Sequence, residues 1–94
     1  MSENESQPKT PLSVYDLLPF FIEQTASVAW QKLGLQHDPV TGALDQDLTQ
    51  ARVAIDVVAF MASQLETQLD EADKRQLQTM VRDLRINFVQ KSGA

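Results

Sequence analysis

The amino-acid sequence predicts an all-α fold of three helices, in which the second and third form an antiparallel hairpin and the first packs across it. Three segments repeat apolar residues at helical spacing, each segment follows a residue that can cap a helix, and no stretch shows the alternation of a strand. The 94 residues have room for one domain. We expect it at residues 13–91, between a disordered acidic tail at 1–12 and a frayed end at 92–94.

The composition excludes several classes of protein. A hydrophobic fraction of 43% and a charged fraction of 22% are those of a globular chain. The sequence has no cysteine, so it has no disulfide and no thiolate site, which favours a reducing compartment, and we expect the cytoplasm. The polar start lacks the pattern of a signal peptide, and the longest apolar region is too short and too interrupted to cross a membrane. The net charge of −5 argues against general attraction to nucleic acid or anionic lipid.

The first helix is predicted to begin near Val14, because Ser13 can cap it and Asp16 stands at the third helical position. Pro19 removes an amide that would bond to the carbonyl of Tyr15, so we expect a kink there or a later start. One broad apolar face is predicted to comprise Val14, Leu17, Leu18, Phe21, Ile22, Thr25, Val28, Ala29 and Leu33.

The second helix is predicted to begin near Asp47, with Gln50 completing a pair like a capping box and Asp45 as a rival cap. Its apolar residues recur at alternating steps of three and four, which is the spacing of a seam packed between helices. The seam is Leu48, Ala51, Ile55, Val58, Ala62, Leu65 and Leu69. A second apolar row leaves only a narrow polar strip, so this helix needs neighbours on most sides. That row is Val53, Val57, Phe60 and Met61.

The third helix is predicted to follow Asp70, with Asp73 three residues on, and to end near Lys91 before Gly93. Its apolar stripe is Leu77, Met80, Val81, Leu84 and Phe88. The short turn before it makes the second and third helices antiparallel neighbours.

The connector between the first two helices contains the chain's one histidine, His37, beside several carboxylates. Asp38, Pro39 and Gly42 have the chemistry of a tight structural turn: a carboxylate that accepts backbone amides, a fixed backbone angle and a tolerance for left-handed geometry. The spacing matches no calcium loop and no paired-histidine zinc site. We therefore predict no metal, no cofactor and no catalytic residue here, and keep metal binding or enzymatic use of the loop as the least favoured hypothesis.

The third helix has a basic edge made of Lys74, Arg75, Arg82 and Arg85. Nucleic-acid binding through this edge is an alternative hypothesis, but the sequence has no interleaved aromatic residues there. Charge pairing within the protein is favoured. Counting back from the turn sets Glu66 level with Lys74, while Asp56 can pair with Arg52 on its own helix or with Arg85 on the next, and the sequence leaves this choice open.

The chain resembles a small bacterial family known as the domain of unknown function number eighteen forty-four. The resemblance spans roughly residues 14–91 and rests on "LGL…P.TG", "DL.QAR..ID" and "LRINFV". The matching residues are Leu33, Gly34, Pro39, Thr41, Gly42, Asp47, Leu48, Ala51, Ile55, Asp56, Leu84 and Arg85. Members carry "KT.GNL" after the second helix, whereas this sequence has "QLETQL" with Thr67 in place of the glycine. The resemblance implies an all-helical cytoplasmic protein and brings no activity with it.

These observations predict a non-catalytic helical interaction module that binds a copy of itself, as a homodimer, or another protein. Three helices can cover one apolar face each, and the second helix has nearly two. The alternative is a monomer whose kinked first helix covers the excess. The candidate interface residues are Phe20, Trp30, Val53, Val57, Met61, Ile86 and Val89.

Overall fold

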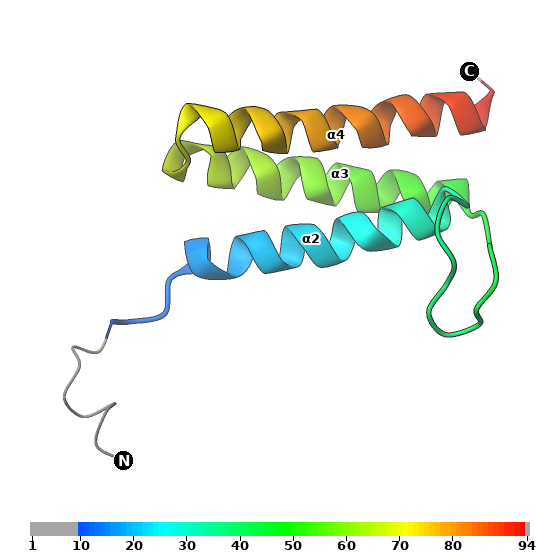
Figure 1. The fold of residues 1–94 in the computed structure, drawn as a ribbon, viewed down its shortest axis with the longest axis horizontal. Helices are drawn as coiled ribbons and strands as arrows, with labels where there is room; N and C mark the ends of the chain where they lie inside the picture. The colour runs from blue at the N-terminus through cyan, green and yellow to red at the C-terminus, as the bar shows by residue number, and fades with distance from the viewer. Residues whose placement is uncertain (1–9, 94) are drawn as a thin grey trace, which may run out of the picture.

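The computed structural model describes residues 10–93 and has three long helices joined by a loop and a tight turn. Its elements are α2 (Val14–Lys32), α3 (Leu48–Leu65), the short 3-10 helix η1 (Glu66–Gln68) and α4 (Glu71–Ser92). Each long helix runs antiparallel to the next one in the chain, and α3 lies between α2 and α4 (Figure 1). The prediction of an all-α fold with an α3–α4 hairpin is confirmed. Of the tail predicted at residues 1–12, residues 1–9 lie outside the described part, as does the last residue of the chain.

Helix α2 begins where the sequence predicts. The Ser13 hydroxyl accepts a hydrogen bond from the Tyr15 amide at 3.1 Å, and the Asp16 carboxylate accepts one from the Ser13 amide at 3.3 Å, which completes a capping box. The helix then continues through Pro19 as one element. A helix that starts only at Pro19 is therefore excluded, because the cap fixes the first turn before the proline is reached.

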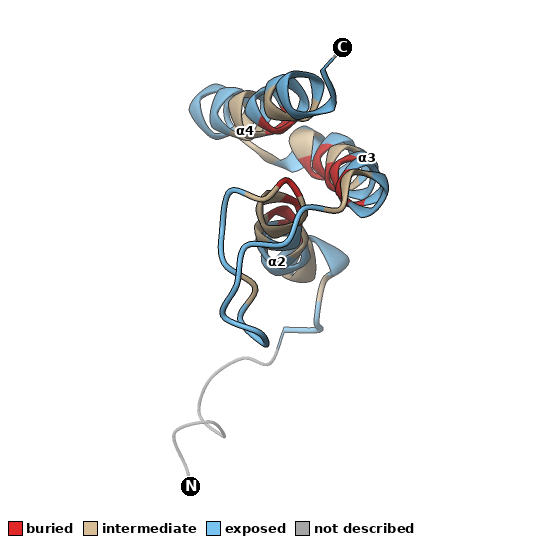
Figure 2. Ribbon diagram, turned by 90° about the vertical axis from the view of Figure 1, so that its right-hand side faces the viewer, coloured by how far each residue is buried: buried red, intermediate tan, exposed pale blue. Residues whose placement is uncertain are grey.

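The core is a thin seam between the helices, with α3 at its centre (Figure 2). The predicted seam of α3 is buried over its length, apart from its partly covered ends Leu48 and Leu69, and Ala54 joins it. The buried apolar residues of the described chain are Ile22, Ala26, Ala29, Leu33, Ala51, Ala54, Ile55, Val58, Ala62, Leu65, Val81 and Leu84.

The broad apolar face predicted for α2 is only partly correct. The structure buries Ile22, Ala26 and Ala29 and leaves Phe21 and Val28 exposed. The reason is that α2 packs almost entirely against α3 and meets α4 only at its margin, so one neighbour covers one narrow side of the helix.

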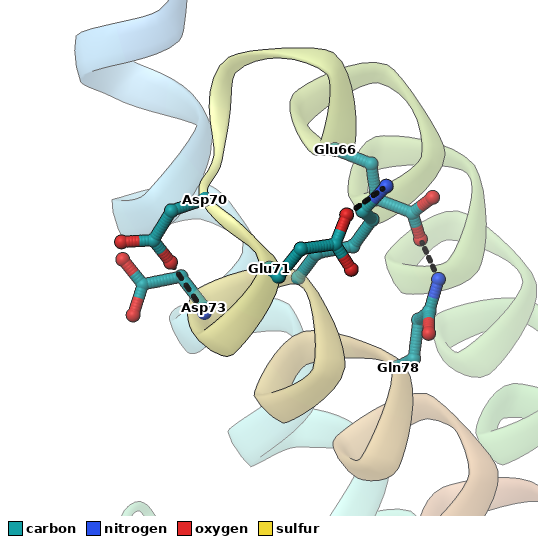
Figure 3. Close-up of polar contacts among 6 residues, drawn as sticks. Glu66, Asp70, Glu71, Asp73 and Gln78 are labelled. Atoms are coloured by element: carbon teal, nitrogen blue, oxygen red, sulfur yellow. Dashed lines mark hydrogen bonds and ion pairs between the residues drawn. The ribbon is translucent and has the colours of Figure 1, made fainter.

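The α3–α4 turn is built from η1 and the cap of α4 (Figure 3). The Asp70 carboxylate accepts a hydrogen bond from the Asp73 amide at 2.8 Å, and Gly93 ends the helix in a left-handed conformation. Thr67 lies within η1, and no residue of the described chain other than glycine has a positive φ. The turn therefore forms without the backbone freedom of glycine at this position.

Within residues 10–93, no helix is both long enough and apolar enough to cross a membrane.

Candidate functional site

The connector from residue 34 to residue 47 is a closed loop. Gly34, at φ 81°, ends α2 in a Schellman motif: its amide bonds to the Gln31 carbonyl at 2.9 Å, and the Leu35 amide bonds to the Trp30 carbonyl at 3.0 Å. At the other end the Asp47 amide donates to the Lys32 carbonyl at 2.8 Å, which ties the start of α3 to the end of α2. The loop is thus anchored by backbone bonds at its neck.

Asp47 rather than Asp45 caps α3. Its carboxylate accepts a hydrogen bond from the Gln50 amide at 3.1 Å, as predicted, and a second from the Gln50 side-chain amide at 3.0 Å. In a standard capping box the side chain at this position would instead accept from the cap's own amide. That amide is already used at the neck of the loop, so the Gln50 side chain turns to the carboxylate.

Asp38 organises the tip of the loop, as the sequence predicts for a structural turn. Its carboxylate accepts hydrogen bonds from the amides of Val40 at 2.7 Å and Thr41 at 3.2 Å, and its carbonyl accepts one from Gly42, which is left-handed at φ 72°. The Val40 amide, and then the Thr41 amide, lower the pKa of the Asp38 carboxyl below its usual range because both stabilise the charged form. All of these bonds serve the backbone of the turn.

His37 lies exposed in the same loop. Within residues 10–93, no three histidine or acidic side chains come together in an arrangement that could hold a metal ion. The loop therefore brings together hydrogen-bonding groups of a turn, and the structure offers no metal-ligand cluster within the described chain.

The outer face of α3 carries a row of exposed apolar side chains. Val53 is 54% exposed, Val57 43% and Phe60 64%, and at 100° per residue all three lie on the side of the helix opposite its buried seam. Met61, from the same predicted row, is partly buried against the core. Helix α2 does not cover this outer face, contrary to the alternative in which a monomer hides its excess apolar surface.

The other candidate interface residues divide between surface and core. Phe20 is exposed and its ring meets the edge of Phe21, with centroids 5.7 Å apart. Trp30 is partly buried against the core, so it is a packing residue more than a surface one. The exposed ring of Phe21 was missed by sequence reasoning, which assigned it to the core, because helical periodicity gives a broad face without saying how much of it a neighbour covers.

A groove of about 780 Å³ runs between α3 and α4. Buried Ala62 and Val81 form its floor, and the exposed candidates Ile86 and Val89 stand along its α4 side. A smaller hollow of about 240 Å³ shares Val89 with it and continues toward the start of α3. The structure thus places two of the predicted interface residues on one concave surface, together with two residues of the basic edge, Arg82 and Arg85.

The structure selects one of the two partners that the sequence left open for Asp56 and gives Lys74 a different partner from the one expected. Asp56 pairs with Arg52 on its own helix, at 3.6 Å between Nη1 and Oδ2. Lys74 pairs with Glu71 at 3.4 Å. The expected match of Lys74 with Glu66 is wrong, because Glu66 accepts a hydrogen bond from the Gln78 side chain at 3.4 Å, one helical turn farther along α4 (Figure 3).

Fold and surface together define a small all-helical protein with an exposed apolar face and an apolar groove bordered by cations. The chain belongs to the family described as domain of unknown function, DUF1844, whose model matches residues 15–90. No curated protein and no solved structure gave a match in the corresponding comparisons. The family description assigns no catalytic activity.

Proposed function

We propose that this protein is a non-catalytic helical interaction module that self-associates, as a homodimer, through the outer face of α3. The observation that supports the proposal is the row of Val53, Val57 and Phe60, spaced by four and three residues and exposed on the side of α3 that faces away from its own core. This spacing is the one with which a helix packs against another helix. Contiguous exposed apolar surface on a small domain is typical of an interaction site.

A second copy suits this face because a two-fold interface sets the same patch against itself. Two α3 helices packed side by side would cover each other's apolar rows. Within residues 10–93 of the single chain Val53 and Val57 remain exposed, so the proposal depends on whether this face becomes covered in solution. The cysteine-free composition supports a reducing compartment, and we propose the cytoplasm.

Sedimentation equilibrium at micromolar concentration tests the proposal. We expect a species of twice the 10.5 kDa chain mass. Val57→Glu should shift it to the mass of a single chain, because a carboxylate would be buried without a partner at the interface. Gln76→Glu adds the same charge at an exposed position of α4, away from the α3 row, and should leave the mass of the wild type unchanged.

Circular dichroism shows whether each variant remains folded. Because Val57 is already part-exposed in the single chain, we expect both variants to keep their helical content. A wild-type species of 10.5 kDa at every concentration up to the millimolar range would overturn self-association.

A further inference from the structure

The groove between α3 and α4 combines an apolar floor with an uncompensated pair of cations. Arg82 and Arg85 lie exposed along it, and neither guanidinium forms an ion pair with any residue of the described chain. On their own helix, the positions three and four residues away from these arginines hold no carboxylate. They are also three residues apart, so each is the other's like-charged neighbour.

The rest of the chain makes this pair unusual. The net charge is −5, with 13 acidic residues available, yet only Glu66 contributes a carboxylate to the larger groove, where its hydrogen bond to Gln78 holds it at one end. The smaller extension has one carboxylate, Asp56, and this pairs with Arg52. The second groove, of about 540 Å³ between α2 and α4, shows the opposite character: it is lined by Glu23 and Asp73 and by no cation. The positive charge is therefore concentrated on one of the two grooves.

We propose that the α3–α4 groove binds an acidic amphipathic helix of a partner protein. The apolar side of that helix would lie on Ala62 and Val81 and against Ile86 and Val89 on the α4 side, and its carboxylates would pair with Arg82 and Arg85. The proposal uses a surface other than the self-association face, because Val53, Val57 and Phe60 line neither the groove nor its smaller extension. The two proposals can therefore fail separately.

The dimensions suit a helix of a few turns. The groove and its extension run along α3 from Glu66 to Arg52, and at 1.5 Å per residue this is about 21 Å, or roughly four helical turns. Helices that bind in such grooves place apolar residues at i, i+3, i+4 and i+7. Opposite charges along the rim then fix their register and orientation.

A nucleic acid is disfavoured as the occupant. Of the predicted basic edge, Lys74 is paired with Glu71 and Arg75 lines no groove, which leaves two cations. No aromatic side chain lines the larger groove, whereas single strands are bound by stacking on such rings. An apolar floor beside two arginines matches a peptide helix better than a phosphate backbone.

Fluorescence anisotropy with a labelled model peptide tests the proposal on the full chain. The probe is a helix-forming peptide of about 18 residues, with leucine at i, i+3, i+4 and i+7 and glutamate at the positions that flank this apolar row, and its matched control has lysine in place of glutamate. We expect saturable micromolar binding of the acidic peptide, weakened by salt, and about tenfold weaker binding to Arg82→Glu or Arg85→Glu. Arg75→Glu changes the net charge equally on the same helix and should bind as the wild type does.

A charge exchange completes the test. The lysine peptide should bind the double variant Arg82→Glu, Arg85→Glu more tightly than it binds the wild type. The Val57→Glu variant should retain binding of the acidic peptide, which separates this result from the test of self-association.

Four results would overturn the proposal: no saturable binding of the acidic peptide, equal losses for Arg75→Glu and Arg82→Glu, tighter binding of a mixed RNA or DNA oligonucleotide than of the peptide, or peptide binding only after residues 1–9 are removed. The last result would make the chain's own first residues the occupant of the groove.

Discussion

Gly34 and Gln46 meet across the neck of the connector: a Cβ built on Gly34 would lie 3.3 Å from the Cβ of Gln46. The Gln46 side-chain amide also donates a hydrogen bond to the Leu33 carbonyl at 3.4 Å, so the two ends of the connector are held against each other. Gly34 ends α2 in a left-handed conformation. Its lack of a side chain therefore permits this backbone conformation and also leaves room for the Gln46 side chain.

Gly34→Ala should therefore destabilise the fold more than Gly42→Ala. Both substitutions force alanine into a left-handed conformation, which costs about 1 kcal/mol each. Only the first adds a contact, because a Cβ at Gly42 would meet nothing within 4 Å. Urea denaturation of both variants measures the difference, and equal losses would show that Gln46 moves aside without cost.

The pKa of Asp38 predicts a pH dependence of stability. Amides of Val40 and Thr41 hold this pKa below the ordinary value of 3.8, so the folded state favours the charged carboxylate. Its contribution to stability is fully present above pH 3.8 and is lost as the pH falls through the lowered, folded-state pKa. Asp38→Asn should be less stable than the wild type at neutral pH, because it keeps an acceptor oxygen without the charge, and this deficit should shrink with acidification.

Denaturation of wild type and Asp38→Asn at a series of pH values measures this deficit. Asp45→Asn is the matched control, because the Asp45 carboxylate accepts no hydrogen bond from the described chain. A deficit of Asp38→Asn that stays constant from neutral pH to well below pH 3.8 would contradict the assigned role of the carboxylate.

Local signals in the sequence predicted what is local in the structure. The helix starts at Ser13, Asp47 and Asp70 follow from side chains that satisfy amides two or three residues away, and these bonds need no knowledge of the tertiary fold. The seam of α3 was also predictable, because α3 lies between two neighbours that select the same periodic residues.

The rotation and height of one helix against another were not predictable in this way. Periodicity assigned Phe21 to the core and missed Ala26, since the width of the buried strip depends on how many helices α2 touches. Counting residues back from the turn placed Lys74 level with Glu66, but η1 shifts the register so that Gln78 reaches it. Both errors arise from tertiary geometry that a single sequence does not encode locally.

Leu84 is fully buried between α3 and α4, at 0% exposure. Leu84→Ala should cost about 2–5 kcal/mol in the free energy of unfolding, through lost burial and the cavity left behind. Leu77→Ala on the same helix should cost less, because Leu77 is only partly buried. Thermal unfolding followed by circular dichroism distinguishes the two, and a larger loss at Leu77 would mean that the α3–α4 packing differs from the one described.

Pro19 interrupts the hydrogen bonding of α2 at an exposed position. An alanine there would supply the amide that can donate to the Tyr15 carbonyl, without removing a core side chain. Pro19→Ala should raise the free energy of unfolding by about 1–3 kcal/mol. Thermal denaturation measures the gain, and a loss of stability instead would show that the proline makes contacts that outweigh the missing bond.

Asp56 pairs with Arg52 on its own helix and not with Arg85 on α4. Their side chains are 62% and 61% exposed, so solvent screens the attraction and the pair should contribute only about 0.3–0.5 kcal/mol. Arg85 nevertheless lines the same small hollow as Asp56, at the end of the proposed binding groove. A double-mutant cycle with Asp56→Asn and Arg52→Gln should give this small coupling, and a cycle with Asp56→Asn and Arg85→Gln should give none. Measurable coupling of Asp56 to Arg85 would mean that Asp56 already neutralises this arginine, which would leave Arg82 alone to attract an acidic helix.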